Sequence, residues 1–185
     1  RGDGDLMNTA KKINYRTQAA YELAKSVPCP RRVNDVYAMG ANLQYCIRAK
    51  YLEIGDPNQK DTRALCTKLV SKQMDIKKQI EKAGQRQLNL LIQSFYEQGG
   101  PIMEDPVSEQ MVKEINPFFN RLMSNFLDSL DEVTDKVSQG EMSVADMETQ
   151  INRDIISMFS ALGNLFAVDE MREAFHELVQ IRESF

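Results

Sequence analysis

Residues 67–86 read TKLVSKQMDIKKQIEKAGQR, and the spacing of their apolar side chains decides the fold class. Leu69, Ile76, Ile80 and Ala83 recur at steps of three, four or seven residues, which places them on one face of an α-helix. The same spacing recurs along most of the chain, and no run of alternating β-branched residues between turn signals competes with it. The sequence therefore predicts an all-α protein.

The apolar pattern predicts about six helices. They are expected over 8–26, 34–55, 61–97, 106–139, 143–165 and from 169 almost to the chain end. Regular apolar seams joined by short turns favour antiparallel helices packed at small crossing angles, as in helical bundles. The pattern leaves open whether the helices form one body or two packed three-helix halves.

Several single residues set the expected helix ends and crossings. Ser143 is expected to cap the helix that follows it, and Asp105 is expected to cap the one before Pro117. At Pro117 that helix either kinks or gives way to a new helix. Gly40 marks either a close helix crossing or a tolerated defect, and Gly84 either continues its helix or forms a hinge.

Charge divides the chain more sharply than hydropathy does. Residues 11–93 carry 16 basic and 7 acidic side chains, a balance of +9, whereas residues 94–185 carry 6 and 18, a balance of −12. Such asymmetry is typical of surfaces that meet partners. The sequence therefore predicts four segments: a disordered or vector-derived start at 1–7, a basic helical half at 8–97, a connector at 98–106 and an acidic helical half at 107–185.

A basic face is the candidate interaction surface of the first half. Its members are Arg31, Arg32, Lys60, Lys68, Lys72, Lys78, Lys82 and Arg86. Such a face can keep a helix in water, neutralise the phosphates of a nucleic acid, or meet the acidic half of the same or another copy. The sequence leaves these three interpretations open.

A resemblance bears on the nucleic-acid interpretation. The run SVPCPRRVNDVYAMGANLQYCIRAKYLEI at 26–54, followed by a basic helix, resembles the small four-helix-bundle accessory proteins of diversity-generating retroelements. The resemblance covers less than half of the chain, and the acidic second half departs from that basic family. It implies an RNA-binding role as the alternative to protein binding.

Methionines are frequent in the acidic half, where they offer a second candidate surface. At helical spacing they act either as core filler or as an adaptable apolar groove. The residues of this candidate groove are Met147, Met158, Met171 and Phe175.

Catalytic signatures are not found in the sequence. His176 is the only histidine, so neither a di-iron site with paired Glu-x-x-His motifs nor a zinc-protease helix can be assembled. The three cysteines, Cys29, Cys46 and Cys66, form no close pair and are expected to pack in the core. We expect no catalytic residue, no metal ligand, no cofactor and no small-molecule substrate.

The expected function follows from these observations. The chain carries no membrane-length apolar run and no secretory signal, and its isolated cysteines favour a cytoplasmic, reducing compartment. We expect a non-enzymatic adapter or assembly module that binds a protein partner or itself through its oppositely charged halves. RNA binding through the basic helix at 60–86 is the alternative.

Overall fold

The computed structural model describes residue 19 and residues 22–54, 60–99 and 107–185. Residues 22–26 are helical, and five longer helices follow: α2 (Val33–Ile54), α3 (Lys60–Gln98), α4 (Glu109–Ser138), α5 (Val144–Gly163) and α6 (Asp169–Glu183). No strand occurs in these ranges, so the prediction of an all-α helical bundle is confirmed. Most of the helix predicted over 8–26 lies outside the described residues.

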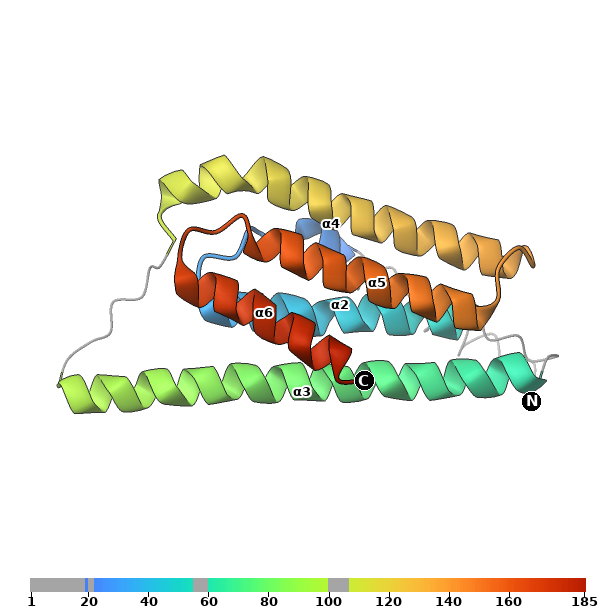
Figure 1. Cartoon of the computed structure of the whole chain (residues 1–185), viewed down its shortest axis with the longest axis horizontal. Coiled ribbons are helices and arrows are strands. Elements are labelled where there is room, and N and C mark those ends of the chain that lie inside the picture. Colours follow the sequence, from blue (N-terminus) through green and yellow to red (C-terminus); the bar gives the residue numbers. More distant parts are fainter. Residues whose placement is uncertain (1–18, 20–21, 55–59, 100–106) are drawn as a thin grey trace.

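Successive helices of the bundle run in opposite directions (Figure 1). α2 packs against α3, α4 and α6, and α5 lies between α4 and α6 while also contacting α3. Because α2 and α3 belong to the basic half and the other three helices to the acidic half, each half packs directly on the other. α3 is the longest helix, and its C-terminal end extends beyond the neighbouring helices in Figure 1.

A single apolar core joins all five helices. Its fully buried members come from both charge halves and include Val36, Leu43, Ile47, Ile76, Ile80, Phe119, Leu130, Ile151, Ile155, Phe175 and Leu178. They stand at the three- and four-residue steps predicted for helix faces, so the core forms where the apolar stripes of the helices meet.

Local sequence signals explain where α4 and α5 begin. The Ser143 hydroxyl accepts a hydrogen bond from the backbone N–H of Asp146 at 3.0 Å, which confirms the predicted cap of α5. Asp105 lies outside the described residues, and the cap of α4 is Ser108, which accepts from the N–H of Met111. α4 continues through Pro117, so no new helix begins there.

Two glycines allow close helix contacts. A Cβ built on Gly40 would lie 2.9 Å from Leu178 Cδ1, which shows that α2 and α6 approach closely there. A Cβ on Gly84 would lie 3.0 Å from Tyr37 Cβ. Gly84 is thus a packing residue between α3 and α2 within a continuous helix.

Candidate interaction surface

The C-terminal part of α3 is an unusual surface among the described residues. The last buried residue of α3 is Gly84, although the helix continues to Gln98. We call residues 85–98 the α3 extension. At 1.5 Å per residue it is about 20 Å long. A helix segment of this length without a buried residue receives no core packing along its apolar positions.

The α3 extension exposes large apolar side chains. Tyr96 is 76% exposed, Leu90 is 57% exposed and Ile92 is 45% exposed, and Leu88 and Phe95 are also exposed. The rings of Phe95 and Tyr96 pack edge to face, with their centroids 5.5 Å apart. Single exposed apolar residues are ordinary, but a group of this kind on one projecting segment is typical of a binding surface.

The apolar spacing does not identify this surface, because Leu88, Leu91 and Phe95 stand at steps of three and four residues that fit a buried helix face equally well. A signal was nevertheless present in the lengths of the helices. α3 has 39 residues, whereas its antiparallel neighbour α2 has 22. At the same rise per residue, α2 is roughly 25 Å shorter than α3 and cannot cover its whole length.

The predicted basic face divides into exposed lysines and paired residues. Lys60, Lys68, Lys78 and Lys82 are exposed on α3. Lys72 instead forms an ion pair with Glu148 of α5 at 2.7 Å. Arg86 lies 3.5 Å from Glu177 of α6. The structure therefore places two members of the basic face against the acidic half of the same molecule.

Arg31 and Arg32 stand apart from this lysine face, in the turn that leads into α2. Their backbone N–H groups donate to Asp35 Oδ2 at 3.2 and 3.1 Å, respectively. The carboxylate therefore fixes the start of α2. Arg32 is exposed, and Arg31 is half-buried beside a cavity between the 22–31 segment, α2 and α3.

That cavity has a volume of about 830 Å³ and a mainly apolar lining that includes Leu23, Val27 and Met39. Cys29 also lines it, and burial raises the pKa of this thiol to about 11. Burial likewise raises the pKa of Cys46 to about 12. Cys66 is buried as well. All three thiols are therefore protonated at neutral pH, as expected of packing residues rather than nucleophiles.

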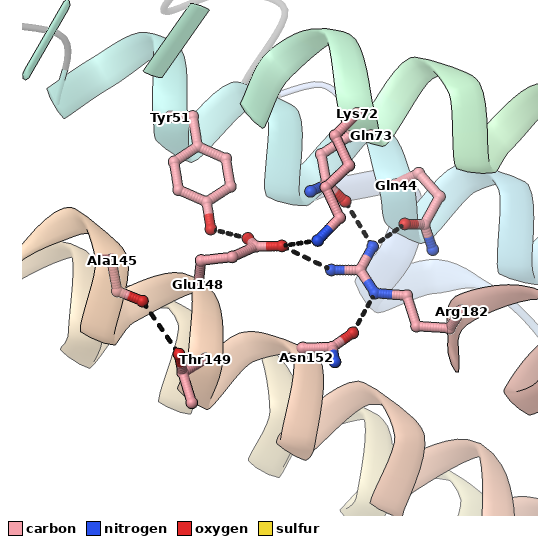
Figure 2. Close-up of polar contacts among 9 residues, drawn as sticks. All are labelled: Gln44, Tyr51, Lys72, Gln73, Ala145, Glu148, Thr149, Asn152 and Arg182. Atoms are coloured by element: carbon pink, nitrogen blue, oxygen red, sulfur yellow. Dashed lines mark hydrogen bonds and ion pairs between the residues drawn. The ribbon is translucent and has the colours of Figure 1, made fainter. Parts of the chain in front are cut away.

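A buried polar network joins the two charge halves near the end of α6 (Figure 2). Arg182 is only 1% exposed. Its Nη1 donates to Gln44 Oε1 of α2 at 2.8 Å and to Gln73 Oε1 of α3 at 2.5 Å. Its Nε donates to Asn152 Oδ1 of α5 at 2.9 Å. One guanidinium thus binds side chains from three other helices.

Glu148 provides the negative charge of this network. Its carboxylate lies 3.7 Å from Arg182 Nη2 and accepts hydrogen bonds from Lys72 and from the Tyr51 hydroxyl. Burial lowers the pKa of Arg182, and the charge of Glu148 opposes that shift. Burial and the neighbouring carboxylate both raise the pKa of Tyr51, which keeps its hydroxyl a donor. These contacts hold helices together and present no group to a substrate.

The residues of the predicted apolar groove lie in the core. Met147, Met158, Met171 and Phe175 are each at most 5% exposed. The prediction of a methionine groove is therefore wrong for these residues. They occupy the inner faces of α5 and α6, where the same helical spacing that favours a groove also builds a core.

A different groove lies between the α3 extension and α6, with Val33, Asn34 and Tyr37 of α2 also lining it, and we call it the α3–α6 groove. It has a volume of about 390 Å³. Leu88, Leu90 and Leu91 line it from α3. Glu170, Glu173, Ala174 and Glu177 line it from α6. One wall is thus mainly apolar, and the other is mainly acidic.

The described residues contain no metal-site cluster and no membrane-spanning helix. Nowhere in these ranges do three His, Cys, Asp or Glu side chains gather as a metal site would require. His176 is exposed on α6. No described helix combines the length and the apolar character needed to cross a membrane.

Comparisons of the chain with protein-family models, with curated proteins and with solved structures gave no match.

Proposed function

We propose that the chain is a protein-interaction module without enzymatic activity, and that it binds its partner through the α3 extension. The observation that carries the proposal is the exposure of Leu90, Ile92, Phe95 and Tyr96 on a helix that extends past its neighbours. Burying each of these partly exposed side chains would contribute roughly 1 kcal/mol. Together they would supply a large share of the free energy of a micromolar complex.

The charges also support an interaction role. They do so through the residues left exposed, because part of the opposite charge already pairs within the molecule. Part of the opposite charge is neutralised inside the molecule, where Lys50 lies 2.8 Å from Asp131 and Lys72 lies 2.7 Å from Glu148. A lysine face on α3 and a set of glutamates on α6 stay exposed, as do several acidic residues of α4 and the start of α5. These separated charges can orient a partner that the apolar extension holds.

The test is selection of binding peptides from a random display library. The target is the wild-type chain, and the comparison is a variant carrying Ile92→Ser, Phe95→Ser and Tyr96→Ser. We expect peptides that bind the wild type and lose binding to this variant. No enrichment, or equal binding to both proteins, would contradict the proposal.

A matched control separates contact from helix content. Gln85→Ser, Asn89→Ser and Gln93→Ser introduce the same number of serines at exposed polar positions of the same segment. This control should keep peptide binding, and circular dichroism should show similar helix content in both variants. Light scattering against the monomer mass of 21.1 kDa reveals whether a second copy is the partner.

Nucleic-acid binding is a second candidate function, and the lysine face favours it. Lys60, Lys68, Lys78 and Lys82 are exposed, and within the described part of the chain none of the four forms an ion pair. Lys68 and Lys82 stand about 20 Å apart along the helix, which is long enough to follow several phosphates.

A salt series with labelled RNA tests this candidate. If all four lysines contact phosphates of a single strand, the logarithm of the binding constant should fall against the logarithm of salt concentration with a slope of about −3. Lys68→Glu combined with Lys78→Glu should abolish binding and leave the helix content unchanged. Binding that is absent, or that ignores salt and charge reversal, would refute this second function.

A further inference from the structure

The α3–α6 groove has two chemically different walls that face each other. Leu88, Leu90 and Leu91 form the apolar wall, with Gln87 and Ser94 beside them. Glu170, Glu173 and Glu177 form the opposite wall. The three glutamates stand at steps of three and four residues, which places their side chains along one face of α6. A molecule lying in the groove would meet leucines on one side and carboxylates on the other.

Two of the carboxylates are available to a partner. Glu177 is occupied, because it accepts a hydrogen bond from the Tyr37 hydroxyl at 3.2 Å and lies 3.5 Å from Arg86. Glu170 and Glu173 are exposed and make no ion pair with the described residues. Glu170 lies in the first turn of α6, where the helix dipole favours an acid. Glu173 lies beyond that turn, so the helix dipole contributes less to favouring an acidic residue there.

The shape and charge of the groove limit the kind of partner that fits. Ile92, Phe95 and Tyr96 are also exposed on the α3 extension, next along the helix but outside the groove lining. An elongated partner that reaches past the groove therefore gains more apolar contact than a compact one. A nucleic acid would bring phosphates toward the glutamates and be repelled. A helix with apolar side chains on one face and lysine or arginine on the next satisfies both walls at once.

A second copy of the described helices does not supply such a helix. The basic segment of α3 already buries its own apolar side chains, including Leu69, Ile76 and Ile80. The α3 extension is apolar but carries only Arg86 and Glu97 as charges. Neither segment offers an exposed apolar face together with several basic residues.

We propose that the α3–α6 groove binds a basic amphipathic helix of a partner protein, with the helix's apolar face on the leucines and its basic face toward Glu170 and Glu173. This proposal rests on the proposed function, because it specifies the class of partner that the interaction module takes. The display selection separates the two claims. Selected peptides should combine leucine-like residues with lysine or arginine at helical spacing. Neutral or acidic peptides that need the α3 extension would leave the proposed function standing and overturn this inference.

A direct titration uses a fluorescein-labelled leucine–lysine amphipathic peptide of about 14 residues, a length that gives roughly four helical turns. The comparison peptide replaces each lysine with glutamate. We expect the leucine–lysine peptide to bind and the leucine–glutamate peptide to bind at least about tenfold more weakly. Equal affinities for the two peptides would overturn the inference.

Charge reversal on the protein locates the binding. Glu170→Lys combined with Glu173→Lys should weaken binding of the leucine–lysine peptide about tenfold and should improve binding of the leucine–glutamate peptide. The matched control, Glu141→Lys combined with Glu183→Lys, makes the same change of net charge at exposed positions that do not line the groove. Equal weakening in both variants would mean that net charge alone attracts the peptide, which would overturn the inference.

Two further measurements test the role of the apolar wall and the possibility that a second copy occupies the groove. Leu90→Ser combined with Leu91→Ser should weaken binding about tenfold, while a peptide with serine in place of leucine should not bind the wild type. Light scattering completes the test. A dimer that dissociates in the Glu170→Lys and Glu173→Lys variant would show that a second copy occupies the groove and would overturn the partner-helix proposal.

Discussion

Replacing Arg182 with methionine should destabilise the bundle strongly, because one buried guanidinium binds side chains from three other helices. Arg182→Met removes the donors to Gln44, Gln73 and Asn152 and leaves the apolar stem almost intact. Its unfolding is best followed by helical circular dichroism in urea and on heating.

The magnitude follows from the contacts that are lost. Gln44 and Gln73 are fully buried, so each carbonyl oxygen left without a donor costs about 1 kcal/mol or more. Asn152 is half-buried, and water can replace part of its bond. Glu148 keeps Tyr51 and Lys72 as donors and is not left as an unpaired charge.

We therefore expect a loss of about 3 kcal/mol, at the lower end of the range for breaking a buried ion pair. For a chain of this size the melting temperature should fall by about 6–12 °C. The matched control is Arg172→Met on the same helix, where an exposed arginine pairs with the exposed Asp169. This control should cost less than about 0.5 kcal/mol.

A compensating variant tests whether the unpaired glutamine oxygens cause the loss of stability. Combining Arg182→Met with Gln44→Leu and Gln73→Leu removes the buried oxygens together with their donor, so stability should return to within about 1 kcal/mol of the wild type. A loss below about 1 kcal/mol for Arg182→Met would show that the network contributes little. A combined variant less stable than Arg182→Met would show that unpaired oxygens are not the source of the cost.

Three further predictions address packing, capping and buried thiols. Gly84→Ala should lower the free energy of unfolding, measured in urea, by about 1 kcal/mol, because the new methyl group meets Tyr37 Cβ at 3.0 Å. This cost should outweigh the better helix propensity of alanine. A more stable variant would contradict the close contact. Ser143→Ala should cost about 1 kcal/mol by loss of the α5 cap, and an unchanged melting curve would count against it. The pKa values of Cys29 and Cys46 are raised in the folded chain from 9.0 to about 11 and about 12. The unfolded chain then loses these protons first, so stability should fall as pH rises above about 9, by up to about 1.4 kcal/mol per pH unit for each thiol. Urea midpoints of a Cys29→Ala and Cys46→Ala variant should fall less steeply with pH, and equal slopes would disprove the assignment.

Much of the fold could be predicted from the sequence, because helix signals are local. Ser143 caps a helix through an N–H three residues away, and apolar steps of three and four residues define one face regardless of distant contacts. For Gly40 the sequence left two interpretations, a close helix crossing or a tolerated defect, and the close approach of Leu178 in the structure supports the first. Local patterns of this kind predict elements well, but they do not fix which elements cover which.

The candidate site was harder to predict for that same reason. Met147 and Phe95 both lie on apolar helix faces, and periodicity assigns them the same character. The structure buries Met147 completely and leaves Phe95 exposed, because α5 lies within the bundle while α3 extends past it. Arg182 is the reverse case. A lone arginine is normally expected at the surface, and nothing in the sequence indicates that this one is buried. Only the tertiary arrangement separates these cases.

In the proposed complex, the exposed charges of α3 and α6 favour one side of α3 for the basic helix. A basic helix placed along the outer face of α3 would meet Lys78 and Lys82, whose like charge repels it. The same helix placed toward α6 would meet Glu170 and Glu173, while the leucines of the α3 extension lie within reach of its apolar face. Repulsion by the lysines and attraction by the glutamates therefore both favour the side of α3 that faces α6. In the proposed complex, the charge split along the chain orients the partner helix, and the uncovered end of α3 provides the apolar contact.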